Sequence, residues 1–380
     1  MTTHVFIVDE TTFKYHLEYM FVGTGAKDND VDFNNNSTTT LHYSKENLLV
    51  GMMADGSRLR QGDYVIFYLQ STVKMEGKFY GIFKVVNDGI FLDNNNENQY
   101  LRAELKKNLT FRQLISPYIV YSEGVSEWEA LDEIKCTPSP YQMIWSLIYR
   151  KLKGNRGNTM ITMYEANKLF RMLECKNPGG PISSQNFTYN LDSKRIESSS
   201  QDHIYEGISN NNINILPRLI NKYNSGGAHE SHLQMFITQN IGKGTNLSLD
   251  EALGINGDNI EWIGNEVSCG VGMQRIDVMY SRVVNEIQCD IVPIELKAVP
   301  ASIDNIRQIK RYIDWIEQYY IPNKPSTICP TLICKSSILS SEVIESFNRF
   351  NADANGRYKP LTYIEYKIEQ GNIIFRRVQY

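Results

Sequence analysis

The stretches QRIDVMY, residues 274–280, and IVPIELK, residues 291–297, decide the fold of the C-terminal part of this chain. Both have the apolar pattern of β-strands, and Glu295 and Lys297 alternate onto one face of the second strand. Exposed strands often carry Glu-x-Lys as a solvated face, but this one closes an apolar run. If the strands pair, Asp277 and Glu295 can share a hard divalent cation such as Mg2+, which takes oxygen ligands. The two stretches therefore predict a metal site with a lysine beside it.

Amphipathic helices are predicted on both sides of this strand pair. The Ser-Gly-Gly of residues 225–227 can cap a helix over about residues 228–241, on which Glu230 shares a face with Leu233 and Ile237. A second helix follows the strands, with an apolar stripe of isoleucines at 303, 306, 309, 313 and 316. The expected order is helix, strand with Asp, strand with Glu-x-Lys, helix.

This order resembles the PD-(D/E)xK nuclease superfamily, the fold of many restriction endonucleases, over roughly the last third of the chain. Within the superfamily it looks most like the archaeal-type mismatch endonucleases and their restriction-enzyme relatives. The resemblance implies metal ligation by Asp277 and Glu295 and a catalytic role for Lys297. It also implies an accessory acid at Glu230, for which an exposed helix acid is the alternative, and a catalytic, site-facing Gln308 with Tyr312 nearby. The family's proline before the aspartate is replaced by Ile276.

Contacts with DNA are expected on the helix that carries Gln308. The formal charge of −4 gives no global support for nucleic-acid binding, so any phosphate contact must be local. The candidates near the predicted metal site are Arg307, Lys310 and Arg311. A solvated helix face is the alternative, because the same helix carries acids: Asp304, Asp314 and Glu317.

The N-terminal part has the pattern of a small β-barrel. A strand is expected at residues 4–8, a Gly-Asp turn opens another at residues 64–69, and residues 79–86 give a third. The pattern resembles the PUA-like group that includes the EVE and YTH domains. The resemblance implies recognition of a modified or flipped base by stacking on aromatic rings. The candidates for this base pocket are Trp128, Tyr68 and Tyr80, with Tyr19 and Trp145 as further possibilities; core filling is the alternative.

The expected fold class is α/β, with more than one domain because 380 residues exceed the size of one usual core. A PUA-like base-reading domain, residues 1–140, precedes a helical and polar linker region, residues 141–224. A restriction-endonuclease-like α/β core with a mixed central sheet, residues 225–380, follows. Within the linker, two amphipathic helices are expected between residues 141 and 173.

Several other classes are disfavoured. No stretch approaches the ~20 apolar residues of a membrane helix, and the start lacks a signal peptide. Six scattered cysteines without a CxxC pair suit reduced thiols, so we expect a cytoplasmic protein. No phosphate-cradling loop predicts binding of a nucleotide triphosphate. His229 and His232 lack the metalloprotease spacing and are expected to be surface or capping residues.

The sequence thus predicts a Mg2+-dependent DNA endonuclease that hydrolyses phosphodiester bonds, a type II or modification-dependent restriction enzyme. Its partner would be double-stranded DNA, and cutting both strands would require a homodimer. Two alternatives stay open. One is a mismatch or structure-specific DNA repair endonuclease. The other is a non-catalytic nucleic-acid-binding protein in which the nuclease fold has only a structural role.

Overall fold

The structure is a computed structural model that describes residues 1–25, 43–73, 75–93, 98–132, 157–211, 213–255, 260–269, 274–320 and 325–380. The chain forms two compact units. Unit 1 comprises Met1–Asp32 and Asp55–Ile213, and unit 2 comprises Phe33–Ala54 and Asn214–Tyr380. The described part of the predicted linker, up to residue 213, therefore belongs to unit 1. Unit 2 includes a segment from the N-terminal part of the chain.

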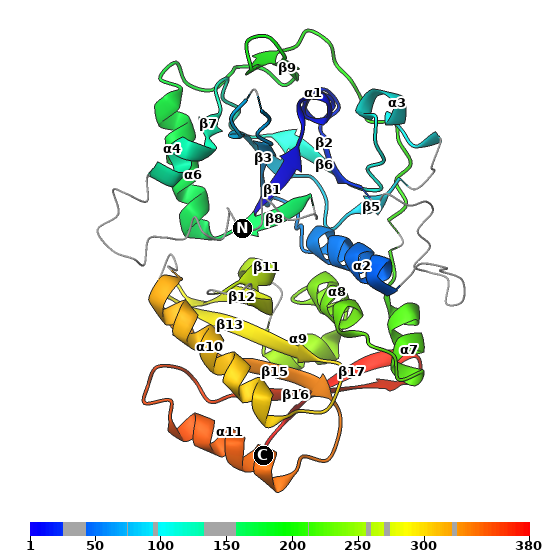
Figure 1. The fold of residues 1–380 in the computed structure, drawn as a ribbon, viewed down its shortest axis with the longest axis vertical. Coiled ribbons are helices and arrows are strands. Elements are labelled where there is room, and N and C mark those ends of the chain that lie inside the picture. Colours follow the sequence, from blue (N-terminus) through cyan, green and yellow to red (C-terminus); the bar gives the residue numbers. More distant parts are fainter. Residues whose placement is uncertain are drawn as a thin grey trace. The chain divides into compact units, whose positions relative to one another are not determined.

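Unit 1 is built on a curled mixed sheet with the strand order β2-β6-β4-β3-β1-β8 (Figure 1). Its strands are β1 (Thr3–Val8), β2 (Phe21–Thr24), β3 (Tyr64–Leu69), β4 (Lys78–Val85), β6 (Phe111–Pro117) and β8 (Asn158–Ile161), with short β5 (Phe91–Leu92) on β6 and β7 (Val125–Ser126) on β4. β1 and β3 are parallel, and the other neighbours on this path are antiparallel. The three predicted strands are confirmed. Among the described residues no pairing joins the end strands β2 and β8, so the sheet is a half-barrel.

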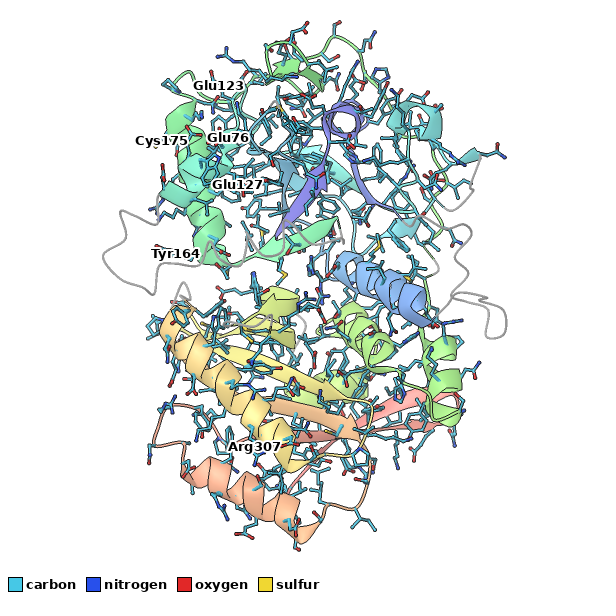
Figure 2. The ribbon with its side chains drawn as sticks, in the orientation of Figure 1. Glu76, Glu123, Glu127, Tyr164, Cys175 and Arg307 are labelled. Atoms are coloured by element: carbon cyan, nitrogen blue, oxygen red, sulfur yellow. The ribbon has the colours of Figure 1, made fainter. Side chains whose placement is uncertain are left out.

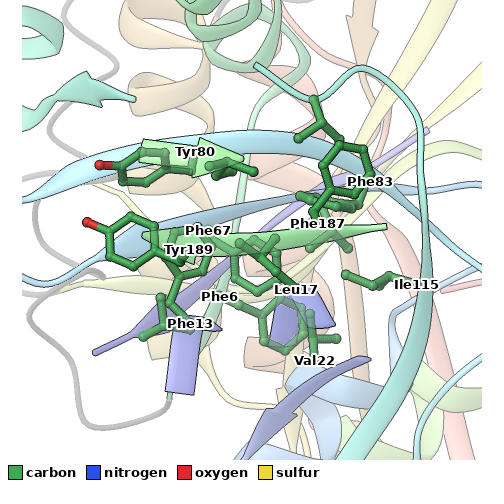
Figure 3. Close-up of a cluster of buried hydrophobic side chains, with 14 of the residues drawn as sticks. Phe6, Phe13, Leu17, Val22, Phe67, Tyr80, Phe83, Ile115, Phe187 and Tyr189 are labelled. Carbon is green, nitrogen blue, oxygen red and sulfur yellow. The ribbon is translucent and has the colours of Figure 1, made fainter. Parts of the chain in front are cut away.

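The two faces of this sheet carry separate hydrophobic clusters, because side chains alternate along each strand. One face, which includes Phe67 and Tyr80, is covered by α1 (Glu10–Glu18) and by the hairpin of β9 (Phe187–Asn190) and β10 (Arg195–Ser198), as Figure 3 shows. The other face, which includes Ile66 and Tyr68, is covered by α6 (Met163–Lys176). α6 confirms the second predicted linker helix, and the first lies outside the described residues.

Glu165 is buried in the first turn of α6. Its Oε2 accepts the backbone N–H of Thr162 at 2.8 Å and the Thr162 hydroxyl at 3.1 Å, which completes a capping box. Its Oε1 has no hydrogen-bond partner among the described residues. Burial, opposed by the Thr162 hydrogen bonds, raises the pKa of Glu165 to about 8.

We expect Glu165→Gln to flatten the pH dependence of stability. The unfolded carboxyl loses its proton near its ordinary pKa of 4.5, whereas the folded one keeps it up to about pH 8. The free energy of unfolding of the wild type therefore falls as the pH rises through this window. Glutamine does not titrate, so the fall should shrink. Urea denaturation across this pH range measures it, with exposed Glu174→Gln on the same helix as control. Equal slopes for Glu165→Gln and wild type would contradict the expectation.

Unit 2 is built on a mixed sheet with the strand order β11-β12-β13-β15-β16-β17 (Figure 1). Its strands are β11 (Ile260–Ser268), β12 (Arg275–Asn285), β13 (Gln288–Lys297), β15 (Thr331–Lys335), β16 (Thr362–Glu369) and β17 (Asn372–Val378), with β14 (Ser326–Ile328) beside β13. β13, β15 and β16 are parallel, and the pairs at both ends are antiparallel. The predicted mixed α/β class is confirmed, and the assignment to a nuclease fold stays a prediction.

Helices surround this second sheet. They are α2 (Tyr43–Ser57, in this unit up to Ala54), α7 (Leu216–Asn224), α8 (Glu230–Asn240), α9 (Leu247–Leu253), α10 (Ile303–Tyr319) and α11 (Ser341–Ala352). α8 packs on β12 and β13, α10 packs on β13, and α11 packs on α10. The predicted helices over residues 228–241 and from 303 onward are confirmed as α8 and α10. Ile306, Ile309, Ile313 and Ile316 form the buried stripe of α10.

Two further features of the chain follow from the described residues. None of the helices they form is long and apolar enough to cross a membrane. The cysteines among them are all free, as the scatter of these residues predicts: Cys175, Cys269, Cys289, Cys329 and Cys334. Cys136 and Trp145 lie outside the described residues.

Candidate active site

The paired strands β12 and β13 bring Asp277 and Glu295 to one place. The register aligns Val278 with Ile294, and one step further along the antiparallel pair sets Asp277 across from Glu295. Because side chains alternate along a strand, Lys297 shares the face of Glu295. The structure therefore juxtaposes the three residues that the sequence selects.

Glu295 is fully buried, and each of its oxygens faces a different group. Oε1 lies 2.5 Å from Nζ of Lys297, and Oε2 accepts the hydroxyl of Tyr312 at 2.5 Å. The same Nζ is 3.6 Å from Oε1 of Glu230, the first residue of α8. Lys297 thus lies between the buried acid of β13 and the half-exposed acid of α8. The contact with Glu230 is direct enough to orient the lysine side chain.

Asp277 is held by backbone and amide groups. Its Oδ2 accepts the N–H of Leu296 at 2.8 Å, and its carbonyl oxygen accepts Nε2 of Gln234 at 2.7 Å. Oδ2 is thereby fixed by the partner strand, while α8 fixes the backbone through Gln234. The position of this carboxylate is set before any ligand binds.

The pKa values of both acids are raised. Burial raises the pKa of Asp277 well above its ordinary value, and repulsion by Glu295 raises it further. Burial also raises the pKa of Glu295, although Lys297 and Tyr312 oppose this. Burial alone would lower the pKa of Lys297, but Glu295 reverses the effect and keeps the ammonium protonated. A bound cation would lower both of these raised pKa values, because a nearby positive charge favours the charged carboxylates.

The donor set fits a magnesium ion better than a structural metal. Oε1 of Glu295 has no partner with hydrogen-bond geometry among the described residues, although Nζ of Lys297 is near it. In the same part of the chain, no three His, Cys, Asp or Glu side chains lie close enough to hold a metal. Mg2+ does not need three, because it commonly binds one or two carboxylates and completes its shell with water and substrate phosphates. Asp277 and Glu295 are the residues that would hold it.

α10 contributes Tyr312 more directly than Gln308. Nε2 of Gln308 donates to the hydroxyl of Tyr312 at 2.7 Å, and Tyr312 in turn donates to Glu295. The Tyr312 hydroxyl is also 2.9 Å from the carbonyl oxygen of Arg275. Gln308 is thus linked to Glu295 through the tyrosine. The spacing of four residues puts the two side chains on one helix face, so the sequence does contain the signal for this pair.

The basic candidates on α10 are exposed: Arg307, Lys310 and Arg311. Arg307, labelled in Figure 2, is paired with Asp304 at 2.8 Å. The acids further along the helix do not dilute the charge as expected, because Asp314 and Glu317 both bind Arg357. Asp304 does offset the charge of Arg307 as expected, and contact of the three cations with phosphate stays a prediction.

Both histidines near Glu230 are buried rather than at the surface, whereas the expected capping position is confirmed for His229. His229 is the N-cap residue of α8, and its Nε2 is 2.9 Å from the hydroxyl of Tyr366. His232 lies 2.7 Å from Oε1 of Glu46 on α2. Such partners, distant in the chain, fix the start of α8 and with it the position of Glu230.

The aromatic candidates of unit 1 do not line one pocket. Tyr80 is buried on one face of the sheet (Figure 3), and its hydroxyl donates to the carbonyl of Lys194 at 2.9 Å. Tyr68 is buried on the other face, and its hydroxyl donates to Glu127 at 2.7 Å. Trp128 is 64% exposed. Tyr68 and Tyr80 fill the core, so the base pocket expected from these three residues is not assembled.

Comparisons with known proteins identify no family for this chain. No protein-family model matches the chain, and no curated protein matches it. One similar solved structure is a hypothetical protein from Leishmania major, with 11% identity, a TM-score of 0.31, and coverage of 46% of this chain and 96% of that one. Another is the human THYN1 protein in complex with 5-methylcytosine-containing DNA, with 10% identity, a TM-score of 0.26, and coverage of 46% and 98%. At these values neither structure assigns a fold or a function to this chain.

Proposed function

We propose that this chain is a Mg2+-dependent DNA endonuclease that hydrolyses phosphodiester bonds at Asp277, Glu295 and Lys297. One observation carries the proposal. Two carboxylates on adjacent strands each have one oxygen held by the protein, through Leu296 and Tyr312, and the ammonium group of Lys297 lies against Glu295. A purely structural role would not require two adjacent acids with raised pKa values, one of them fully buried, because such a pair costs stability.

Each residue has a specific role in this proposal. A bound Mg2+ would supply Lewis-acid polarisation of the phosphate and a water of lowered pKa. Tyr312 and the Leu296 amide hold the two carboxylates in place without reorganisation. Glu230 keeps the Lys297 ammonium directed at the site, where it can orient the attacking water or stabilise charge that develops on the phosphate.

The biological context that we propose is restriction of DNA. In this account unit 1 reads a modified or flipped base and unit 2 cuts the strand. A single site cuts one strand, so double-strand cleavage requires a homodimer. A mismatch or structure-specific repair enzyme would use the same chemistry, and only the preferred substrate separates the two.

The test is a panel of duplexes incubated with the full chain, either with Mg2+ or with EDTA. The panel contains unmodified, 5-methylcytosine, 5-hydroxymethylcytosine and mismatched DNA. We expect discrete cleavage products in Mg2+ and none in EDTA. Preference for a modified duplex supports restriction, and preference for the mismatch supports repair. Intact duplexes under every condition would leave the non-catalytic binding protein as the better account.

A further inference from the structure

Unit 1 contains a basic cavity of about 820 Å³ that the predicted aromatic pocket does not include. One wall is the end of β2 together with Gly157. The other wall is the helix α3 (Arg102–Leu105) and the loop that follows it. Among the described residues, the charged side chains that line the cavity are all basic: Arg102, Lys106 and Lys107. Within a chain of formal charge −4, this is a local positive surface.

The wall opposite the cations is glycine backbone. A Cβ atom at Gly25 would lie 1.9 Å from the carbonyl oxygen of Asn108, so no other residue fits there without a shift. Gly157 has a φ of +71°, a conformation that L side chains rarely adopt. The Cβ direction of Gly25 meets Asn108 and that of Gly157 meets Thr24, so these glycines let the segments that form the cavity pack closely against one another.

The basic segment is held in an unusual conformation. Leu101 and Lys106, which flank α3, both have left-handed backbone angles, with φ of 59° and 57°. Such strain in non-glycine residues persists only where the surroundings hold it, and it concentrates at functional sites. Arg112 holds both ends of the segment, because Nη2 donates to the carbonyl of Tyr100 and Nε donates to the carbonyl of Leu109, each at 2.7 Å.

The arginine that holds this segment is itself fully buried. Arg112 lies 3.2 Å from Asp93, which is also fully buried, and its Nη1 donates to the hydroxyl of Tyr205 at 3.0 Å. A buried ion pair is a costly way to stabilise a fold. Here it fixes the geometry of the segment that carries Arg102 and Lys106. Their side chains show no partner in the described part of the chain, whereas Lys107 is engaged by Asp9.

We propose that this cavity binds phosphate groups of a nucleic-acid strand through Arg102 and Lys106. This assignment rests on the proposed function as a DNA endonuclease. What it adds is the site at which unit 1 would contact the DNA strand. Two cations without an acid partner among the described residues suit the anionic oxygens of a phosphodiester. The volume is in the range of about 300–1,000 Å³ that holds a ligand of nucleotide size.

The test is fluorescence anisotropy with labelled duplex and single-stranded oligonucleotides and the full chain, in EDTA so that no cleavage occurs. Arg102→Ala/Lys106→Ala should raise Kd about tenfold or more at low salt. The plot of log Kd against log salt should also become shallower by about 1.4–1.8, which corresponds to two lost phosphate contacts. Exposed Arg171→Ala on α6, outside the cavity, should leave both values unchanged.

Each other outcome overturns this assignment. Wild-type affinity and salt slope in the double variant would mean that the cavity makes no phosphate contact. Competition by a mononucleotide as strong as that by an unlabelled strand would mean that it takes free nucleotides instead. Neither outcome bears on cleavage, which is measured separately with Mg2+. Conversely, a chain that never cleaves but shows the expected loss of affinity keeps the cavity assignment and loses the nuclease.

Discussion

Lys297→Ala should lower the rate of duplex cleavage at least about 100-fold, the usual effect of removing a group that stabilises developing charge. The ammonium lies 2.5 Å from Glu295 and 3.6 Å from Glu230, so no other described cation replaces it in those contacts. Its removal also leaves the buried carboxyl of Glu295 without its neutralising partner, which should raise the pKa of Glu295 further. Single-turnover cleavage of a labelled duplex at saturating enzyme measures the loss.

The matched control for this substitution is Lys367→Ala. Lys367 is an exposed lysine on β16 that pairs with Glu369. Its substitution should leave the cleavage rate within about twofold of wild type, as expected for an exposed ion pair. DNA affinity in EDTA should be unchanged in both variants. If Lys297→Ala cut DNA as fast as Lys367→Ala, the lysine would have no part in the reaction.

Asp277→Asn should abolish cleavage and, without metal, make the protein more stable. Burial and the repulsion by Glu295 raise the pKa of Asp277, so this carboxyl destabilises the fold at neutral pH. Asparagine keeps an oxygen that can accept the Leu296 N–H, but it carries no charge. We expect a gain of at least about 1 kcal/mol in the free energy of unfolding, the value of one pKa unit. Active-site groups commonly reduce stability in this way.

The pH dependence of this gain has a definite sign. The unfolded carboxyl ionises at its ordinary pKa, and the folded one ionises only at a higher pH, so the stability of the wild type falls as the pH rises between the two values. The advantage of Asp277→Asn should therefore be small in acid and grow toward neutral pH. Mg2+ should stabilise the wild type by mass action but not the variant. Denaturation in EDTA and in Mg2+ measures both effects, and a variant less stable than wild type in EDTA would contradict the expectation.

Much of the structure of unit 2 could be predicted from local patterns in the sequence. Period-two alternation places Glu295 and Lys297 on one face, and the antiparallel pairing of β12 with β13 sets Asp277 across from Glu295. The apolar stripe of α10 likewise predicts which side faces the sheet. That stripe puts Tyr312 inward, where it meets Glu295. The shared faces depend on spacings of two to four residues, which a single sequence displays directly, whereas setting Asp277 across from Glu295 also needed the expectation that the two strands pair.

Features that depend on distant contacts could not be predicted. Glu46 supports α8 through His232 from 186 residues away, and Arg357 binds Glu317 from 40 residues away. The prediction of an aromatic base pocket was wrong for a related reason. Tyr68 and Tyr80 look alike as aromatic residues of strands, but the register of β3 with β4 sends them to opposite faces. The basic cavity around Arg102 was not predicted either. Arg112 holds its wall in place through hydrogen bonds to two main-chain carbonyl groups, and only the folded chain brings these groups together.

The central claim is that Asp277 belongs to a metal-dependent nuclease centre. The most direct test incubates supercoiled plasmid with wild type and with Asp277→Asn, purified side by side, in Mg2+. We predict that the wild type nicks or linearises the plasmid and that the variant, although folded and at least as stable, leaves it supercoiled. Equal conversion by both proteins, or none by either on any DNA of the panel, would contradict the account.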